Sequence, residues 1–270
     1  MTWNEIVLCA AAVAAGMINS VAGGGTLLTF PALMEVLRLS PSLGVPAGLI
    51  GVFANGTSTV ALLPGSAVAA WEYRREFREA GLWFAWLLVP SVIGGLAGAL
   101  LVIQSPDWFD RLVPWLILTA AVLFALQPQV SRWIAHNPEH GRPSGLRFVG
   151  ILLFQLAVAL YGGYFGAGIG ILMLSALALM GLSDIHRMNG VKNLCATCIN
   201  GMAAGVFIAR GKVEWSLVWP MLISAIVGGF VGSRIARRTN RTIVRRVVVV
   251  IGFTLAAYYF YRQFRGLNGG

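Results

Sequence analysis

Charged side chains are scarce in this sequence of 270 residues. They make up 11% of the chain, whereas a soluble globular domain has about 25%. Hydrophobic residues make up 57%, and apolar runs of membrane-spanning length recur, for example over 81–103 and 214–234. This composition excludes an ordinary soluble protein. It predicts an all-α, polytopic transmembrane helical bundle.

Cysteine is also rare, and Cys9, Cys195 and Cys198 are the three in the chain. The last two have the C-x-x-C spacing of a redox or metal pair, but a second such pair is missing. At i and i+3 of a helix both thiols lie on one face, which favours two small core residues; a sulfur relay stays an alternative. H-E-x-x-H and nucleophile-elbow motifs are absent, so we expect no enzymatic step, no metal and no cofactor.

Ten apolar segments, five in each half, make up most of the chain. They cover 4–22, 26–37, 43–66, 81–103 and 109–127, then 146–164, 168–181, 188–209, 214–234 and 244–261. A hydrophilic stretch rich in proline and arginine separates the halves. We therefore predict a first transmembrane repeat over 1–127, a cytoplasmic linker over 128–145 and a second repeat over 146–270.

The two halves share patterns in the same order. Ser20-Val21-Ala22-Gly23-Gly24-Gly25-Thr26 precedes the second segment of the first half, and Phe165-Gly166-Ala167-Gly168-Ile169-Gly170 that of the second half. In the fourth segments, Val92-Ile93-Gly94-Gly95-Leu96-Ala97-Gly98 matches Ile226-Val227-Gly228-Gly229-Phe230-Val231-Gly232 in character. Small residues at this spacing let membrane helices approach closely, so the fourth-segment patterns are expected to be packing surfaces. The glycine clusters are expected at the interface between repeats.

The net charge of +10 fits short cationic loops better than a nucleic-acid partner. If the ten segments alternate across the membrane, thirteen cations lie on one side and six on the other. The larger group is Arg74, Arg75, Arg78, Arg132, Arg142, Arg147, Arg187, Arg234, Arg237, Arg238, Arg241, Arg245 and Arg246; the smaller is Arg38, Arg111, Arg210, Lys212, Arg262 and Arg265. The positive-inside rule then predicts extracytoplasmic termini. Because five segments per half is odd, it also predicts inverted repeats.

An alternative topology has fewer spans. If each glycine cluster joined two segments into one broken span, there would be eight spans and parallel repeats. The same cations would then divide ten against nine, which removes the charge asymmetry. The inverted arrangement of five segments per half is therefore favoured, and the number of transmembrane helices stays between eight and ten.

The glycine clusters are the candidate binding site. No charged residue lies near them, so we expect these turns at membrane depth, where irregular backbone is tolerated only if it is buried or lines a cavity. A helix that begins there presents free N–H groups and partial positive charge to an anion. The candidate residues are Asn19, Ser20, Gly23, Gly24, Gly25 and Thr26 in the first half and Gly166, Gly168 and Gly170 in the second.

The third segments add polar candidates in equivalent positions. They contribute Asn55, Thr57 and Ser58 in the first half and Lys192, Asn193 and Asn200 in the second. An intramembrane cation is costly and by default marks a functional site, so Lys192 is expected to neutralise a transported anion. The alternative is that its side chain extends to the cytoplasmic boundary near Asp184.

These residues resemble those of the sulfite exporter TauE/SafE family, also described as the 4-toluene sulfonate uptake permease family. The matching words are Ala22-Gly23-Gly24-Gly25-Thr26, Pro31-Ala32-Leu33, Ala54-Asn55-Gly56-Thr57-Ser58-Thr59-Val60-Ala61-Leu62, Pro64-Gly65-Ser66, Gly166-Ala167-Gly168-Ile169-Gly170, Met188-Asn189-Gly190-Val191-Lys192-Asn193-Leu194 and Gly211-Lys212-Val213-Glu214-Trp215. The second glycine cluster of the family is often richer in glycine than this one, in which Ile169 intervenes. The family often has Asn at the position of Ser58.

The resemblance implies a multi-pass permease of the cell membrane. Its substrates would be small sulfur-containing anions such as sulfite, thiosulfate or sulfonates, moved by secondary transport. An anion channel is an alternative, and the oligomeric state is left open.

Overall fold

A computed structural model describes residues 3–21, 24–80, 82–136, 145–182, 184–236 and 241–267. Across these ranges the chain forms helices and connecting turns, with no strand. The α-helices are α1 (Trp3–Val21), α2 (Thr26–Leu39), α3 (Ile50–Glu72), α4 (Arg74–Ala80), α5 (Leu88–Gln104), α6 (Pro106–His136), α7 (Gly145–Tyr164), α8 (Ile169–Leu179), α9 (Ile185–Ala209), α10 (Trp215–Ala236) and α11 (Arg241–Leu267). Short 3₁₀ helices cover Pro41–Leu43 (η1), Ala47–Leu49 (η2) and Leu82–Leu87 (η3). The predicted all-α class is confirmed.

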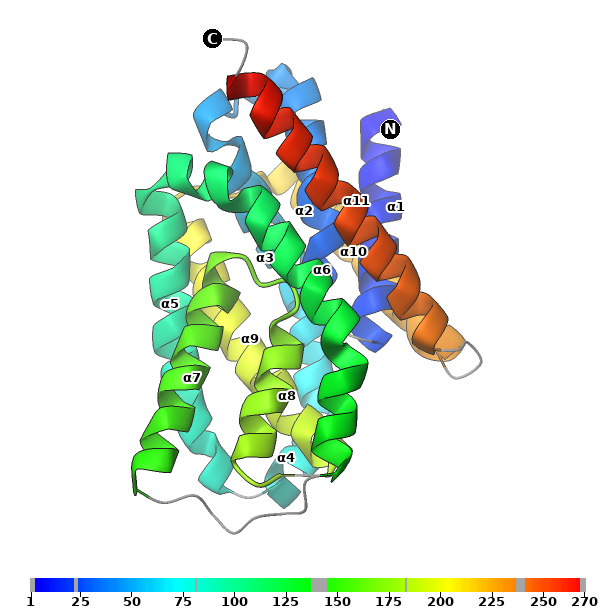
Figure 1. The fold of residues 1–270 in the computed structure, drawn as a ribbon. Helices are drawn as coiled ribbons and strands as arrows, with labels where there is room; N and C mark the ends of the chain where they lie inside the picture. The colour runs from blue at the N-terminus through cyan, green and yellow to red at the C-terminus, as the bar shows by residue number, and fades with distance from the viewer. Residues whose placement is uncertain are drawn as a thin grey trace.

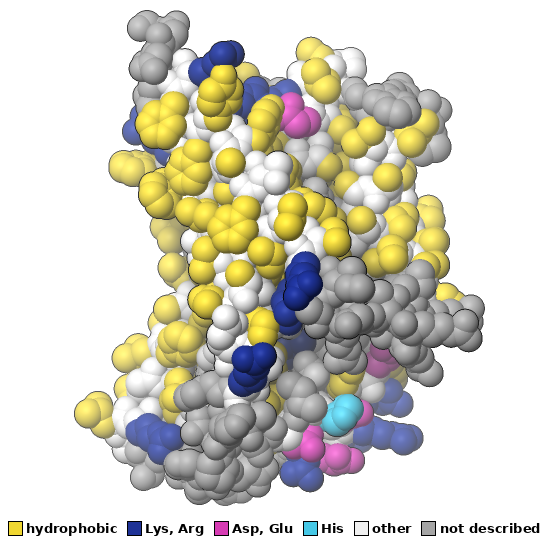
Figure 2. All heavy atoms as spheres, turned by 45° about the vertical axis from the view of Figure 1, so that its right-hand side comes forward, with side chains coloured by type: hydrophobic (Ala, Val, Ile, Leu, Met, Phe, Trp, Pro, Cys, Tyr) yellow, Lys and Arg dark blue, Asp and Glu magenta, His cyan; other side chains and the backbone are white. Residues whose placement is uncertain are grey.

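Six helices within the described ranges are long and apolar enough to cross a membrane. The spans are Ala47–Glu72, Phe84–Gln104, Pro106–Arg132, Gly145–Tyr164, His186–Ala209 and Arg245–Arg265. Shorter apolar helices cover Ile6–Asn19, Ile169–Leu179 and Trp215–Val231. On the face seen in Figure 2, hydrophobic side chains cover most of the upper half, and most of the acidic side chains lie at the bottom. The protein is a multi-pass membrane protein.

The two chain termini lie toward the same end of the bundle (Figure 1). α4 and the beginning of α7 lie at the opposite end. This arrangement agrees with an even number of crossings between the termini. The membrane side of each end stays a prediction, and Arg142, Arg237 and Arg238 of the larger cation group lie outside the described residues.

Each of the ten predicted segments corresponds to an α-helix, but several helix bounds differ from the predicted ones. α6 continues through Pro128 to His136, into the predicted linker, because Val130 still packs on the core and offsets the hydrogen bond lost at proline. Residues 137–144 of that linker lie outside the described residues. The arginine-rich stretch that we expected to be a loop forms α4 instead. Gly190 in α9 lets α4 approach closely, since a Cβ there would lie 2.7 Å from the Phe77 backbone nitrogen.

The glycine-rich patterns of the fourth segments form packing surfaces, as predicted. α5 packs along α7, and α10 packs along α1. A Cβ at Gly94 would lie 2.6 Å from the Ala159 Cβ of α7, and a Cβ at Gly228 would lie 2.8 Å from the Val13 Cα of α1. Each half therefore contributes the helix of its fourth segment to pack against the first helix of the other half. The inverted relation of the two halves stays a prediction.

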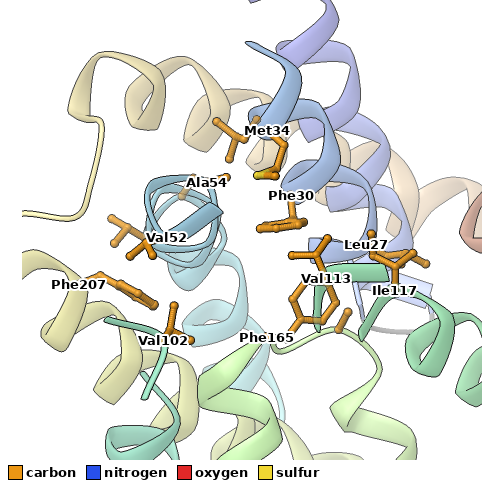
Figure 3. Packing of buried hydrophobic residues seen from close by; sticks show 14 of the residues in the cluster. Leu27, Phe30, Met34, Val52, Ala54, Val102, Val113, Ile117, Phe165 and Phe207 are labelled. Atoms are coloured by element: carbon orange, nitrogen blue, oxygen red, sulfur yellow. The ribbon is translucent and has the colours of Figure 1, made fainter. Parts of the chain in front are cut away.

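The larger hydrophobic core surrounds α2. Figure 3 shows Phe30 of α2 near Val113 of α6, with Val52 and Ala54 of α3 alongside. The ring of Phe30 also meets Phe165, in the turn before α8, edge to face at a centroid distance of 5.2 Å. The core therefore ties α2 to the glycine turn of the second half.

Candidate functional site

Two helices that begin at the glycine clusters are too short to cross a bilayer. α2 has 14 residues and α8 has 11, which gives about 21 and 17 Å against a hydrocarbon core of about 30 Å. α2 runs toward the end that holds Arg262, which pairs with Glu35. α8 runs toward the opposite end, where the Leu179 carbonyl accepts a hydrogen bond from Arg147 (Figure 1). The two short helices thus leave the middle of the protein in opposite directions.

The two glycine turns meet in the middle of the protein. Gly24, Gly166 and Gly168 have φ values of +95°, +83° and +80°, a region that favours glycine. A Cβ at Gly24 would lie 3.4 Å from the backbone nitrogen of Gly168. Two helix N-termini therefore lie side by side, and their partial positive charges suit an anion.

Polar side chains from three elements lie around this meeting point. A Cβ at Gly166 would lie 3.8 Å from Asn200 Oδ1 and 4.0 Å from Thr26 Oγ1. Asn19 Oδ1 accepts a hydrogen bond from the Gly25 backbone nitrogen at 2.7 Å. The structure thus brings together five predicted residues from α1, α2, α9 and the two turns. Gly23 lies outside the described residues, and so does the side chain of Ser20.

Lys192 lies beside the first turn of α8. A Cβ at Gly170 would lie 3.5 Å from Lys192 Cδ, so the side chain of Lys192 runs along the N-terminal end of α8. Its ammonium group donates to Asn189 Oδ1 at 2.8 Å. Within the described ranges, no carboxylate pairs with Lys192. The half-buried lysine is therefore an uncompensated positive charge next to a helix N-terminus.

Asp184 does not pair with Lys192. Its carboxylate caps α9 by accepting a hydrogen bond from the backbone nitrogen of Arg187 at 2.8 Å. This hydrogen bond holds the pKa of the Asp184 carboxyl below its ordinary value. The structure gives no support to the alternative in which Asp184 draws Lys192 to the membrane boundary.

The polar side chains of α3 form hydrogen bonds to other parts of the chain. Ser58 Oγ lies 2.6 Å from Thr29 Oγ1 of α2, and Thr57 Oγ1 accepts from the Glu214 backbone nitrogen at 2.9 Å. Asn55 donates to the Tyr164 carbonyl at 2.9 Å. These contacts attach α3 to both halves of the candidate site. A direct contact of Asn55, Thr57 or Ser58 with substrate stays a prediction.

Asn55 and Asn193 differ in how their groups are placed. The side chain of Asn55 is 1% exposed, and its Oδ1 has no hydrogen-bond partner among the described residues. Asn193 is half-buried, and its backbone carbonyl and that of Ser66 share the Thr197 hydroxyl as donor. The side-chain carbonyl of Asn55 is therefore a buried acceptor without a partner among the described residues.

Two neighbours of the site were not predicted from the sequence. The ring of Phe124 covers Gly24, with its Cε2 atom 2.7 Å from the Cβ position of that glycine. Asp110 lies near the start of α6, and its Oδ1 is buried against Gly51 and has no partner among the described residues. Phe124 has no signal in the sequence beyond its apolar run. Only tertiary packing shows that Phe124 lies against Gly24 and Asp110 against Gly51.

Comparisons with known proteins agree with a membrane transporter. A "Probable membrane transporter protein" of Haemophilus influenzae (strain ATCC 51907 / DSM 11121 / KW20 / Rd) is 28% identical over 271 residues, covering 96% of this chain and 94% of the relative. "Probable membrane transporter protein YfcA" of Escherichia coli (strain K12) is 30% identical over 261 residues, covering 94% and 89%. "Probable membrane transporter protein ORF9" of Sinorhizobium sp is 30% identical over 251 residues, covering 92% and 89%.

Fold and relatives together define the chain as a membrane transporter. Residues 8–259 match the family described as Sulfite exporter TauE/SafE. The chain belongs to the sulfite exporter TauE/SafE family. The resemblance found from the sequence is confirmed.

Proposed function

We propose that this transporter moves a small sulfur-containing anion, such as sulfite, thiosulfate, a sulfonate or a related organic anion, across the cell membrane by alternating access. The observation that carries the proposal is the position of Lys192 along the first turn of α8. A lysine ammonium has three donors, and Asn189 takes one of them in the described structure. The remaining donors and the α8 N-terminus can bind the same anion.

The two short helices support alternating access. They start at touching glycine turns and run to opposite ends, so an anion between them would be about equally far from both membrane faces. Transporters built from inverted repeats hold substrates at such a midplane and expose them by moving one repeat against the other. In this proposal the end with α4 and the linker faces the cytoplasm, because it carries the larger cation group.

A binding screen tests the substrate class. Purified transporter is heated with sulfite, thiosulfate, sulfate, taurine-like sulfonates or carboxylates, and the melting temperature is recorded. A ligand that binds the folded protein stabilises it by about 2.7 kcal/mol at 100 times its Kd, so a substrate raises the melting temperature with its concentration. Sulfur-containing anions are expected to give larger shifts than carboxylates. Equal shifts for all anions would contradict the substrate class.

Transport kinetics separate a carrier from an anion channel. A carrier in proteoliposomes saturates with substrate and shows counterflow, in which unlabelled anion inside drives uptake of labelled anion. A flux without saturation or counterflow would identify a channel and overturn alternating access.

The two cysteines of α9 are expected to be dispensable for transport. Cys195 is 1% exposed in the second hydrophobic core cluster, and Cys198 is half-buried; both are free thiols. The double variant Cys195→Ala, Cys198→Ala should therefore retain transport in proteoliposomes, with a modest loss of stability from the smaller side chain at Cys195. Loss of transport in a variant that elutes as a folded protein would favour the sulfur relay.

A further inference from the structure

Asp110 is a carboxylate inside the membrane-spanning part of α6, which covers Pro106–Arg132. Its Oδ1 atom is buried and has no hydrogen-bond partner among the described residues. The atom lies against Gly51 of α3, where a Cβ would collide with Oδ1 and lie 3.2 Å from Cγ. The missing side chain at Gly51 therefore makes the space that encloses this oxygen. The residue as a whole is half-buried, so a proton can reach the carboxyl group from the surface of the bundle.

Aromatic rings pack beside this carboxylate. The adjacent Phe109 is fully buried, and its ring meets Phe30 of α2 at a centroid distance of 5.9 Å and Tyr164 of α7 at 5.3 Å, both edge to face. Phe109 also lies 3.3 Å from the Cβ position of Gly51. An ionised carboxylate oxygen without a donor is costly in such surroundings, whereas the neutral carboxylic acid costs much less.

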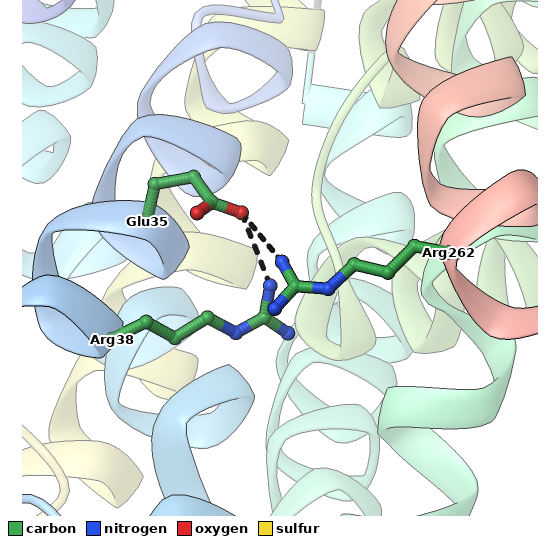
Figure 4. A network of polar contacts seen from close by, with 3 residues as sticks. All are labelled: Glu35, Arg38 and Arg262. Atoms are coloured by element: carbon green, nitrogen blue, oxygen red, sulfur yellow. Dashed lines mark hydrogen bonds and ion pairs between the residues drawn. The ribbon is translucent and has the colours of Figure 1, made fainter. Parts of the chain in front are cut away.

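The groups that interact electrostatically with Asp110 come from α2, α6 and α7. Arg38 of α2 and Asp107 of α6 act on the carboxyl group, and the carboxyl group acts on Tyr164 of α7. The fourth helix around it, α3, faces it with a glycine. Arg38 also donates to Glu35 at 3.1 Å, as Figure 4 shows. Asp110 therefore shares its cationic neighbour with another carboxylate.

A short connection of polar groups leads from Asp110 to the glycine turn of the second half. Gly51 and Asn55 lie at i and i+4 on one face of α3, about 6 Å apart along the helix axis. Asn55 donates to the Tyr164 carbonyl at 2.9 Å, and α7 ends at Tyr164, two residues before Gly166. The carboxylate at Gly51 is therefore about one turn of α3 away from the backbone that leads into the candidate anion site.

We propose that Asp110 binds a proton together with the transported anion, so that the protein is a proton–anion symporter. This role rests on the proposed anion transport and adds the coupling ion to it. The proton converts the carboxylate of Asp110 to a neutral carboxylic acid, and no other bond forms or breaks. A deprotonated Asp110 repels an anion in the nearby site through a poorly hydrated interior, and a protonated one does not. By linkage, the bound anion strengthens proton binding by the same factor, and both leave when the site opens to the other side.

The pH dependence of anion binding to the purified wild-type transporter tests this role. Thiosulfate and methanesulfonate are the probes, because they stay ionised over the range used and cannot carry the proton themselves. Their Kd is measured by calorimetry between about pH 5 and pH 8, where folded proteins are generally stable. Binding should weaken as the pH rises, by up to about tenfold per pH unit if one proton is bound with each anion.

Variants show whether Asp110 is the group that takes up the proton. Asp110→Asn should lose the pH dependence, because its amide is neutral at every pH, and Asp110→Glu should retain it. The matched control is Asp107→Asn, which removes an exposed carboxylate of the same helix and should keep the wild-type slope of affinity against pH. Melting temperature and gel filtration show which variants are folded. A pH dependence that survives in folded Asp110→Asn would assign the proton to another group, such as Lys192, and overturn the proposal.

Proton flux in proteoliposomes tests the coupling with the wild-type protein, so it stays decisive even if a variant does not fold. The vesicles contain a pH-sensitive dye, and protein-free vesicles are the blank. Entry of thiosulfate down its own gradient should acidify the interior, and an acidic exterior should drive accumulation of labelled thiosulfate. Saturable transport without acidification, or transport driven by a Na⁺ gradient instead, would overturn the role of the proton and leave the permease intact. No transport of any sulfur-containing anion would contradict the proposed function itself.

Discussion

Replacing Gly228 by alanine is expected to destabilise the transporter strongly. The new methyl group would lie 2.7 Å from the carbonyl carbon and 2.8 Å from the Cα of Val13, and it would also meet the Val13 carbonyl oxygen. All three atoms are backbone, so α1 and α10 must move apart along their shared surface. Overpacking of this kind costs about 1–3 kcal/mol. The better helix propensity of alanine, worth up to about 1 kcal/mol, offsets only part of it.

The melting temperature of the purified protein and its yield in the membrane measure this effect. Gly94→Ala should behave similarly, since its Cβ would lie 2.8 Å from the Leu156 carbonyl and from the Leu160 nitrogen of α7. Gly205→Ala is the matched control, because Gly205 is also helical and its Cβ position has no atom within 4 Å. A wild-type melting temperature for Gly228→Ala and Gly94→Ala would contradict the close approach of these helices.

Local patterns along the chain were enough to predict the ten apolar helices and the two central turns. The apolar segments have the length of membrane helices, and the lack of charge near Gly24 and Gly168 placed both turns at membrane depth. The equivalence of the two glycine clusters, together with the charge count, predicted that they face each other. The 3.4 Å between the Gly24 Cβ position and the Gly168 nitrogen agrees with that expectation.

Features that depend on contacts between distant segments could not be predicted in this way. An arginine-rich stretch is typical of a solvated loop. Only the lack of a side chain at Gly190, against which α4 packs, shows why a helix forms there. Ser58 and Thr57 looked like free hydroxyls in a polar stretch. Their partners, Thr29 and the Glu214 backbone, come from other helices and loops, so spacing in the sequence does not show them.

Lys192 lies beside the α8 N-terminus, whereas Lys212 lies in the loop after α9. Substitutions at these two positions give the sharpest test of the anion site. Lys192→Gln should weaken binding of the transported anion by about 10- to 100-fold, because a hydrogen bond to a charged group is worth about 1.5–3 kcal/mol. Glutamine keeps a similar length and a hydrogen-bond donor but removes the positive charge beside the α8 N-terminus. Binding to purified protein is measured by thermal shift and calorimetry, with the anion that gives the largest effect in the screen.

The matched control is Lys212→Gln. Lys212 lies in the loop after α9, and its ammonium is 5.5 Å from the centre of the Phe53 ring. This variant should bind the anion like the wild type. Lys192→Arg keeps the charge but not the shape of the ammonium, so it should recover part of the lost affinity. If both glutamine variants bind normally, the charge of Lys192 does not contribute to the site. If both lose affinity equally, the effect is a general one of net charge, and the α8 N-terminus holds no specific cation for the anion.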